Sequence, residues 1–148
     1  MTDLKNKWVA ITGASSGFGR AAAVAFGSAG AHLMLGARRM ERLEETARLA
    51  LEVGAASACP FSLDVSSTPS VEEFGNALAQ RTSELQVLIN NAGGALGVDT
   101  LLEGKDEDWE TMLQTNVLGL LRVSRRLIPL MLRVEGALVI NVGSIAGR

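Results

Sequence analysis

The amino-acid sequence predicts an α/β protein in which helices cover a parallel β-sheet. Short apolar or β-branched runs alternate with longer helical stretches, and glycine or proline residues separate many of them. The alternation continues along the chain without repeats or low-complexity linkers. A chain of 148 residues can bury a core of its own, so we expect one domain spanning residues 1–148.

The composition of the chain argues against nucleic-acid, membrane and metal-binding functions. Hydrophobic residues make up 47% of the chain and charged residues 20%, and the net charge is -2, so we expect neither nucleic acid nor a membrane surface as a partner. The N-terminus has no apolar leader segment and no apolar run is long enough to span a membrane, which favours a cytoplasmic location. Cys59 is the only cysteine, and no Cys/His cluster has the spacing of a metal site.

The first half of the chain predicts three strands and two helices. We expect strands from Trp8 to Thr12 and from His32 to Gly36, with a helix between them that ends near Gly30. A helix with one apolar stripe then runs to Gly54. The third strand, residues 56–63, contains Pro60, which has no N–H for a ladder and therefore predicts a sheet edge.

The second half continues the pattern. Thr68 before Pro69 predicts a capped helix, a fourth strand runs from Gln86 to Asn90, and Asp106 is expected to cap a long helix to about Leu127. The last strand, residues 137–142, is an almost continuous apolar run, which is typical of a strand buried on both faces.

A glycine-rich turn joins the first strand to the first helix. Gly13, Gly17 and Gly19 allow a tight turn, and they let backbone N–H groups at a helix N-terminus approach a pyrophosphate. A glycine-rich stretch alone is also compatible with an ordinary turn. The strand before it and the helix after it favour the phosphate-binding interpretation.

The spacing TGxxxGxG resembles that of the short-chain dehydrogenase/reductase family. Four further motifs of that family follow in order: Asp64-Val65, NNAG from Asn90, NVLG from Asn116, and GSIAG from Gly143 to Gly147. The resemblance implies a Rossmann-type doubly wound sheet of about five strands in the order 3-2-1-4-5, ending before a sixth strand. In that order the third strand is an edge, as Pro60 also predicts.

The end of the second strand predicts which nicotinamide cofactor is preferred. NAD-selective folds place an acidic residue there, but this sequence reads Ala37-Arg38-Arg39. A guanidinium group can bind the 2′-phosphate of NADP, so NADP is favoured over NAD, with Arg38 as the main ligand and Arg39 assisting. The alternative is that both arginines belong to the solvated face of the following helix.

The resemblance implies the remaining cofactor contacts. Ser15, Ser16 and Phe18 of the turn would lie beside the cofactor. Asp64 and Val65 would border the adenine, and Asn90, Ala92 and Gly93 would line the cofactor and support the central strands. The alternative for the asparagines is a plain turn-forming role.

Hydride transfer to a carbonyl also needs a proton donor at the developing alkoxide. The resemblance implies a Ser that polarises the carbonyl, a Tyr acid/base with its Lys, and an Asn that holds a relay water; Ser144 and Asn116 match the Ser and the Asn. The sequence contains no Tyr. We therefore expect the 148-residue chain to be inactive.

Two explanations remain open at this point. The chain is the N-terminal part of a longer NADP-dependent oxidoreductase, or it is a short NADP-binding sensor or interaction module. A methyltransferase is a third class, which the missing acidic residue after the second strand argues against. For the complete enzyme, the resemblance implies a small alcohol or carbonyl substrate, such as a 3-hydroxy acid or β-hydroxy amino acid, and a homo-oligomer paired through the long helix.

Overall fold

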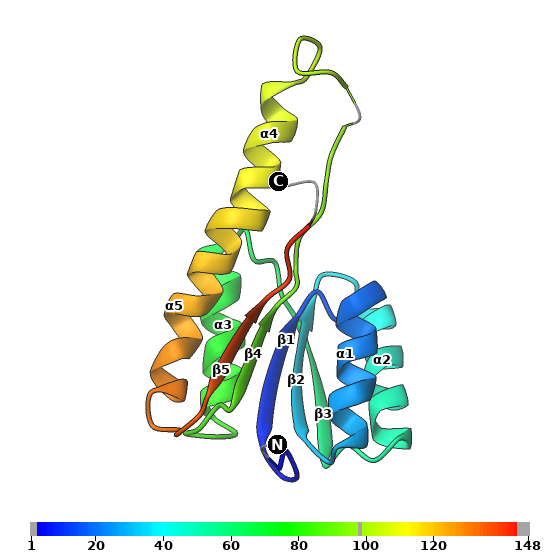
Figure 1. Cartoon of the computed structure of the whole chain (residues 1–148), viewed down its shortest axis with the longest axis vertical. Helices are drawn as coiled ribbons and strands as arrows, with labels where there is room; N and C mark the ends of the chain where they lie inside the picture. The colour runs from blue at the N-terminus through cyan, green and yellow to red at the C-terminus, as the bar shows by residue number, and fades with distance from the viewer. Residues whose placement is uncertain (1–2, 98, 145–148) are drawn as a thin grey trace.

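The computed structural model describes residues 3–97 and 99–144, and their strands form one parallel sheet with helices on both faces (Figure 1). The order across the sheet is β3-β2-β1-β4-β5, as the sequence predicted. The strands are β1 (Trp8–Thr12), β2 (His32–Ala37), β3 (Ser57–Ser62), β4 (Val87–Asn90) and β5 (Leu138–Asn141).

Helices α1 (Gly17–Ser28) and α2 (Met40–Glu52) cover one face of the sheet, and α3 (Thr68–Ala79) and α5 (Leu120–Met131) cover the other (Figure 1). Helix α4 (Asp106–Met112), a π-helical segment η1 (Leu113–Gly119) and α5 run end to end. Figure 1 shows that α4 rises well beyond the carboxyl ends of the strands.

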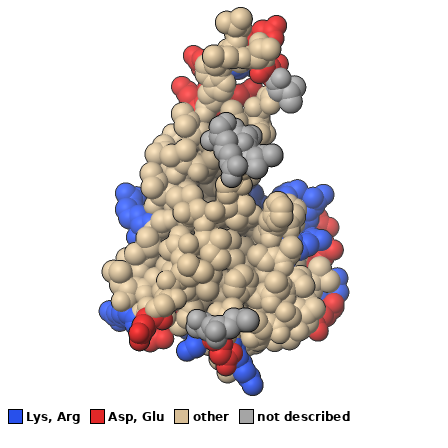
Figure 2. Space-filling model, in the orientation of Figure 1, with Lys and Arg blue, Asp and Glu red and all other residues tan. Residues whose placement is uncertain are grey.

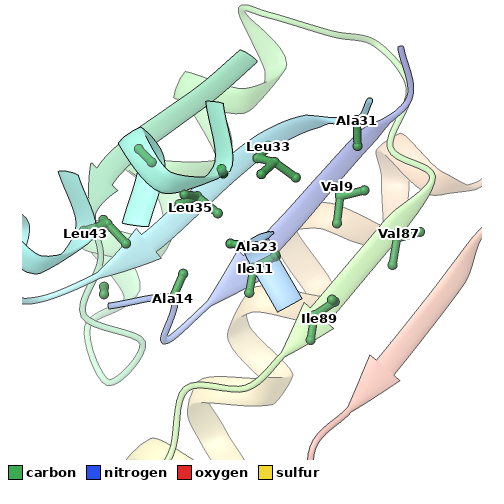
Figure 3. Close-up of a cluster of buried hydrophobic side chains, with 13 residues drawn as sticks. Val9, Ile11, Ala14, Ala23, Ala31, Leu33, Leu35, Leu43, Val87 and Ile89 are labelled. Carbon is green, nitrogen blue, oxygen red and sulfur yellow. The ribbon is translucent and has the colours of Figure 1, made fainter. Parts of the chain in front are cut away.

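Alternation along the strands divides the core into two layers. Val9 and Ile11 of β1 pack under α1 and α2 in the cluster drawn in Figure 3, whereas Ala10 between them packs on the opposite side with Phe74 of α3. Successive strand residues point to opposite faces, so a run buried on both sides must be apolar throughout. All four of these side chains are fully buried.

The edge position of β3 is confirmed. Pro60 pairs with Leu35 of β2, and in the described residues β3 has no neighbour on its other side. The missing N–H of proline therefore interrupts no second ladder.

Two predicted helix caps are wrong by one residue. Ser67, not Thr68, is the N-cap of α3, and its side chain accepts a hydrogen bond from the backbone N–H of Ser70 at 3.4 Å. Asp106 is the first residue of α4 and Lys105 is the N-cap, so Asp106 contributes a negative charge to the first turn instead of a cap. The long helix also continues through Pro129 to Met131.

The prediction that the last strand is buried on both faces is wrong for the described residues. Leu138 and Val139 of β5 are 52% and 37% exposed, and within residues 3–97 and 99–144 β5 pairs only with β4. An apolar strand of this kind is normally buried on both faces, whereas here two of its side chains are exposed.

Candidate functional site: a hollow at the carboxyl ends of the strands

A hollow of about 610 Å³ lies where the chain leaves the carboxyl ends of β1 to β4. This volume is within the range of small-molecule sites. Figure 2 shows Lys and Arg side chains gathered at this level of the molecule, over the adjoining ends of α1 and α2. The lining residues are Gly13, Ser15, Ser16, Phe18, Ala37, Arg38, Arg39, Leu63, Asp64, Val65, Asn91, Ala92, Gly93 and Thr115.

The glycine turn owes its shape to two close approaches of the backbone. Gly13 has φ +67°, and a Cβ there would lie 2.8 Å from Asn91 Nδ2 and 2.9 Å from Ala92 Cα. A Cβ on Gly19 would collide with the carbonyl oxygen of Gly13. Both positions therefore require glycine, and no side chain caps the first turn of α1. The N–H groups of that turn are available to an anion.

Asn91 ties the end of β4 to this turn. Its Nδ2 donates to the carbonyl oxygens of Thr12 and Gly13, each at 3.1 Å. The backbone N–H groups of Asn91 and Ala92 donate to Thr12 Oγ1, at 3.1 and 3.0 Å. The two loops that line the hollow are thereby fixed to each other.

The two arginines after β2 have different surroundings. Arg38 lines the hollow beside Ala37, which is 6% exposed. The Nη2 atom of Arg39 donates to Ser16 Oγ at 2.9 Å and to Ser15 Oγ at 3.2 Å. The guanidinium of Arg39 therefore already bridges α2 and the glycine turn.

Asp64 and Val65 lie on the loop after β3. The hydroxyl of Ser66 donates to Asp64 Oδ1 at 2.6 Å and its backbone N–H donates to the same atom at 2.9 Å. The pKa of Asp64 is lowered, first by the Ser66 hydroxyl and further by the Ser66 N–H and the positive charges of Arg38 and Arg122, although burial opposes the shift. Asp64 is therefore an ionised acceptor at neutral pH.

Asn90 is placed behind the hollow and is absent from its lining. Its Nδ2 donates to Ser124 Oγ at 3.0 Å and to Asn141 Oδ1 at 2.9 Å, which joins β4 to α5 and β5. Its own Oδ1 is buried with no hydrogen-bond partner among the described residues. The neighbouring Asn91, which the sequence reasoning did not select, is the asparagine that faces the hollow.

The predicted catalytic pair lies outside the residues that line the hollow. Asn116, in η1, accepts from the Gly94 N–H at 2.9 Å through Oδ1 and donates to the Gly94 carbonyl at 2.8 Å through Nδ2. Its neighbour Thr115 lines the hollow. Ser144 is exposed on the segment after β5. Residues 145–147 of the GSIAG motif lie outside the described residues.

Of the other predicted site residues, most line the hollow and two glycines do not. Gly13, Ser15, Ser16, Phe18, Arg38, Arg39, Asp64, Val65, Ala92 and Gly93 line the hollow. Gly17, with φ +53°, and Gly19 belong to the same turn but do not line the hollow. In the part of the chain that is described, no cluster of three or more His, Cys, Asp or Glu residues could hold a metal ion, and no helix could cross a membrane.

A parallel sheet in the order 3-2-1-4-5, with a glycine turn leading into α1, defines a Rossmann-type fold. The profile described as short chain dehydrogenase matches residues 7–148. The chain belongs to the short-chain dehydrogenase/reductase family.

Curated relatives are longer than this chain. A sulfoacetaldehyde reductase of Chromohalobacter salexigens is 44% identical over 144 residues, which cover 95% of this chain and 55% of the relative. An NADP-dependent 3-hydroxy acid dehydrogenase of Schizosaccharomyces pombe is 39% identical, with 100% of this chain and 58% of the relative covered. The chain thus spans a little over half the length of these relatives.

Solved structures agree in fold. An alcohol dehydrogenase of Thermococcus sibiricus in complex with 5-hydroxy-NADP has a TM-score of 0.86 and 36% identity, covering 93% of this chain and 57% of that chain. A serine dehydrogenase of Escherichia coli has a TM-score of 0.83 and 36% identity, covering 95% and 63%.

Proposed function

We propose that this chain is the cofactor-binding part of an NADP-dependent oxidoreductase that interconverts an alcohol and a carbonyl. The observation that carries the proposal is the end of β2, where Ala37 and Arg38 border the hollow. A carboxylate at this position would repel a 2′-phosphate, whereas the guanidinium of Arg38 attracts one. Several relatives are named as NADP-dependent 3-hydroxy acid dehydrogenases.

The lining residues suit a dinucleotide phosphate. The glycines of the turn have no side chains that would shield its backbone from a ligand. The first turn of α1 has no side-chain cap, so its N–H groups can bind the pyrophosphate. Asp64 and Val65 would border the adenine, and Ala92 and Gly93 the ribose side of the cofactor. The bound nicotinamide would supply the hydride acceptor or donor, and these residues would hold and orient it.

Ser144 and Asn116 would serve the substrate side of the reaction. The side chain of Asn116 makes two hydrogen bonds with the backbone of Gly94 and thereby fixes the loop after NNAG. The preceding residue on the same helical segment, Thr115, lines the hollow. The sequence holds no phenol for proton transfer, since its Tyr count is zero. We therefore propose that the 148-residue chain binds the cofactor without turning over.

A feature that the substrates of several named relatives share supports a proposed substrate class. A 3-hydroxy acid, serine and sulfoacetaldehyde all carry an acidic group on the carbon next to the reacting carbon. We propose that the complete protein acts on a short alcohol or carbonyl of this kind, and that carboxylate and sulfonate compounds compete for one site. A panel of 3-hydroxypropionate, serine and isethionate with NADP tests this class on the complete protein.

The cofactor proposal is tested by dissociation constants for NADPH and NADH, measured by fluorescence titration. Arg38→Ala should weaken NADPH binding about tenfold and leave NADH unchanged, since one charge-assisted contact is lost. Ala37→Asp should reverse the preference. NADPH preference that survives both substitutions would contradict the proposal.

Two other interpretations predict different results in binding and activity assays. A sensor module would bind NADPH and remain without activity in the complete protein, and a methyltransferase would bind S-adenosylmethionine in place of NADPH. A cytoplasmic location and pairing of complete subunits through α4, η1 and α5 remain predictions. Light scattering of the complete protein tests the pairing.

A further inference from the structure

We propose that Arg39 positions the glycine turn and keeps its anion site open, while Arg38 alone selects the 2′-phosphate. The inference rests on the proposed function, because it assigns the two arginines separate tasks at the same cofactor site. It also departs from the expectation that Arg39 assists in binding the 2′-phosphate.

The contacts of Arg39 point to the turn. Its Nη2 atom donates to two neighbouring hydroxyls, Ser16 Oγ at 2.9 Å and Ser15 Oγ at 3.2 Å. Ser15 is 4% exposed, so its hydroxyl is part of the packed turn and provides a fixed anchor. A guanidinium whose Nη2 atom is already held by two hydroxyls loses little further freedom when a ligand binds.

Ser16 is the N-cap of α1, which gives this contact a second effect. A serine at an N-cap normally accepts a hydrogen bond from the N–H of the second or third helical residue. Here Ser16 has extended backbone angles, φ -165° and ψ 173°, and its side chain makes no such bond. Its hydroxyl is instead held by Arg39.

The consequence concerns competition for the N–H groups of the first turn. If Ser16 Oγ capped α1, it would occupy an N–H group that a pyrophosphate needs. By holding the hydroxyl, Arg39 leaves these donors to the ligand. Because NADP and NAD have the same pyrophosphate, the effect of Arg39 should be equal for both cofactors.

The test compares three substitutions by NADPH and NADH titration of the 148-residue chain. Arg39→Ala should weaken the binding of NADPH and of NADH about tenfold each. The ratio of the two dissociation constants should stay within about twofold of its original value. Arg38→Ala should change that ratio. Arg42→Ala removes the same charge from an exposed site on α2 and is the matched control, with little effect on either constant.

A double variant isolates the capping effect. In the Arg39→Ala background, Ser16→Ala removes the hydroxyl that would otherwise cap α1, so part of the lost affinity should return for both cofactors. A loss confined to NADPH, or no rescue by Ser16→Ala, would overturn the inference.

Amide hydrogen exchange of the ligand-free chain keeps the two proposals separate. Arg39→Ala should change exchange in residues 13–20 while Arg42→Ala does not, with thermal melting as a check that each variant is folded. If neither cofactor binds the parent chain, the proposed function fails, and exchange still decides whether Arg39 positions the turn. Unchanged exchange in residues 13–20 would refute the positioning role.

Discussion

The half of the sheet formed by β1, β2 and β3 and the half that ends in β5 differ in how far their side chains are covered. Leu33 and Leu35 of β2 are fully buried between the helix layers. Leu138 and Val139 of β5 are exposed, and Leu113 and Leu121 on η1 and α5 are more than half exposed. Figure 2 shows a broad face without Lys, Arg, Asp or Glu over this second region.

This difference parallels the division of the candidate site. Most residues that line the hollow lie at or after the ends of β1, β2 and β4, whose strand residues are mostly buried, or after the half-buried edge strand β3, and they form the proposed cofactor side. Ser144 follows β5, the least covered strand of the described chain. The proposed cofactor side is therefore supported mainly by buried strands, whereas the proposed substrate side follows a strand whose Leu138 and Val139 side chains are exposed.

Replacing one leucine with alanine in β4 and one in β5 measures how differently the two strands are buried. Leu88→Ala in β4 should reduce the free energy of unfolding by about 2–5 kcal/mol, because Leu88 is fully buried and a cavity remains. Leu138→Ala in β5 should cost less than about 1 kcal/mol, because Leu138 is 52% exposed. Urea unfolding measures both. Equal losses would mean that β5 is as well covered as β4.

The next effect concerns the close approach at the glycine turn. Gly13→Ala should weaken NADPH binding about thirtyfold, since its Cβ would meet Asn91 and Ala92 and displace the two loops. Gly136→Ala is the matched control, because Gly136 has a similar φ of +73° but open space around its Cβ position. Fluorescence titration compares them. If both variants bind equally, the backbone contact at Gly13 is unimportant.

The smallest effect is a pH dependence from Asp64. Folding lowers the pKa of this carboxyl, so the unfolded chain binds the proton more strongly and the stabilising contribution is present above the ordinary pKa. It should disappear as pH falls through the lower folded pKa. The stability difference between the parent and Asp64→Asn should therefore shrink on acidification, measured by urea unfolding from pH 7 downward.

Glu135→Gln, on the exposed turn before β5, is the control for Asp64→Asn, since it removes one negative charge without the Ser66 contacts. A difference for Asp64→Asn that stays constant with pH would contradict the lowered pKa.

Much of the fold was predictable because short, continuous apolar runs mark parallel strands that are buried on both faces. The strand order followed from the resemblance and from Pro60, and β1 to β4 lie within one residue of their predicted bounds. The caps at Ser67 and Lys105 were missed because adjacent polar residues compete for one cap position, and backbone geometry decides between them.

The candidate site was predictable in its residue types but not in its division of tasks. Asn90 and Asn91 are neighbours, and the alternation at the end of β4 sends one behind the sheet and the other to the hollow. The hydrogen bonds from Arg39 to Ser15 and Ser16 join segments that are distant in sequence, so no local sequence pattern predicts them. The exposure of β5 likewise depends on what surrounds the strand and not on its composition.

We propose that these 148 residues build a cofactor site that prefers NADP and lack the proton donor for turnover. One experiment tests both parts: titrate the chain with NADPH and NADH, and follow NADPH absorbance with a 3-oxo acid or sulfoacetaldehyde present. We expect saturable binding that is tighter for NADPH, with no consumption of the cofactor. Absence of NADPH binding, tighter binding of NADH, or steady oxidation of NADPH would contradict it.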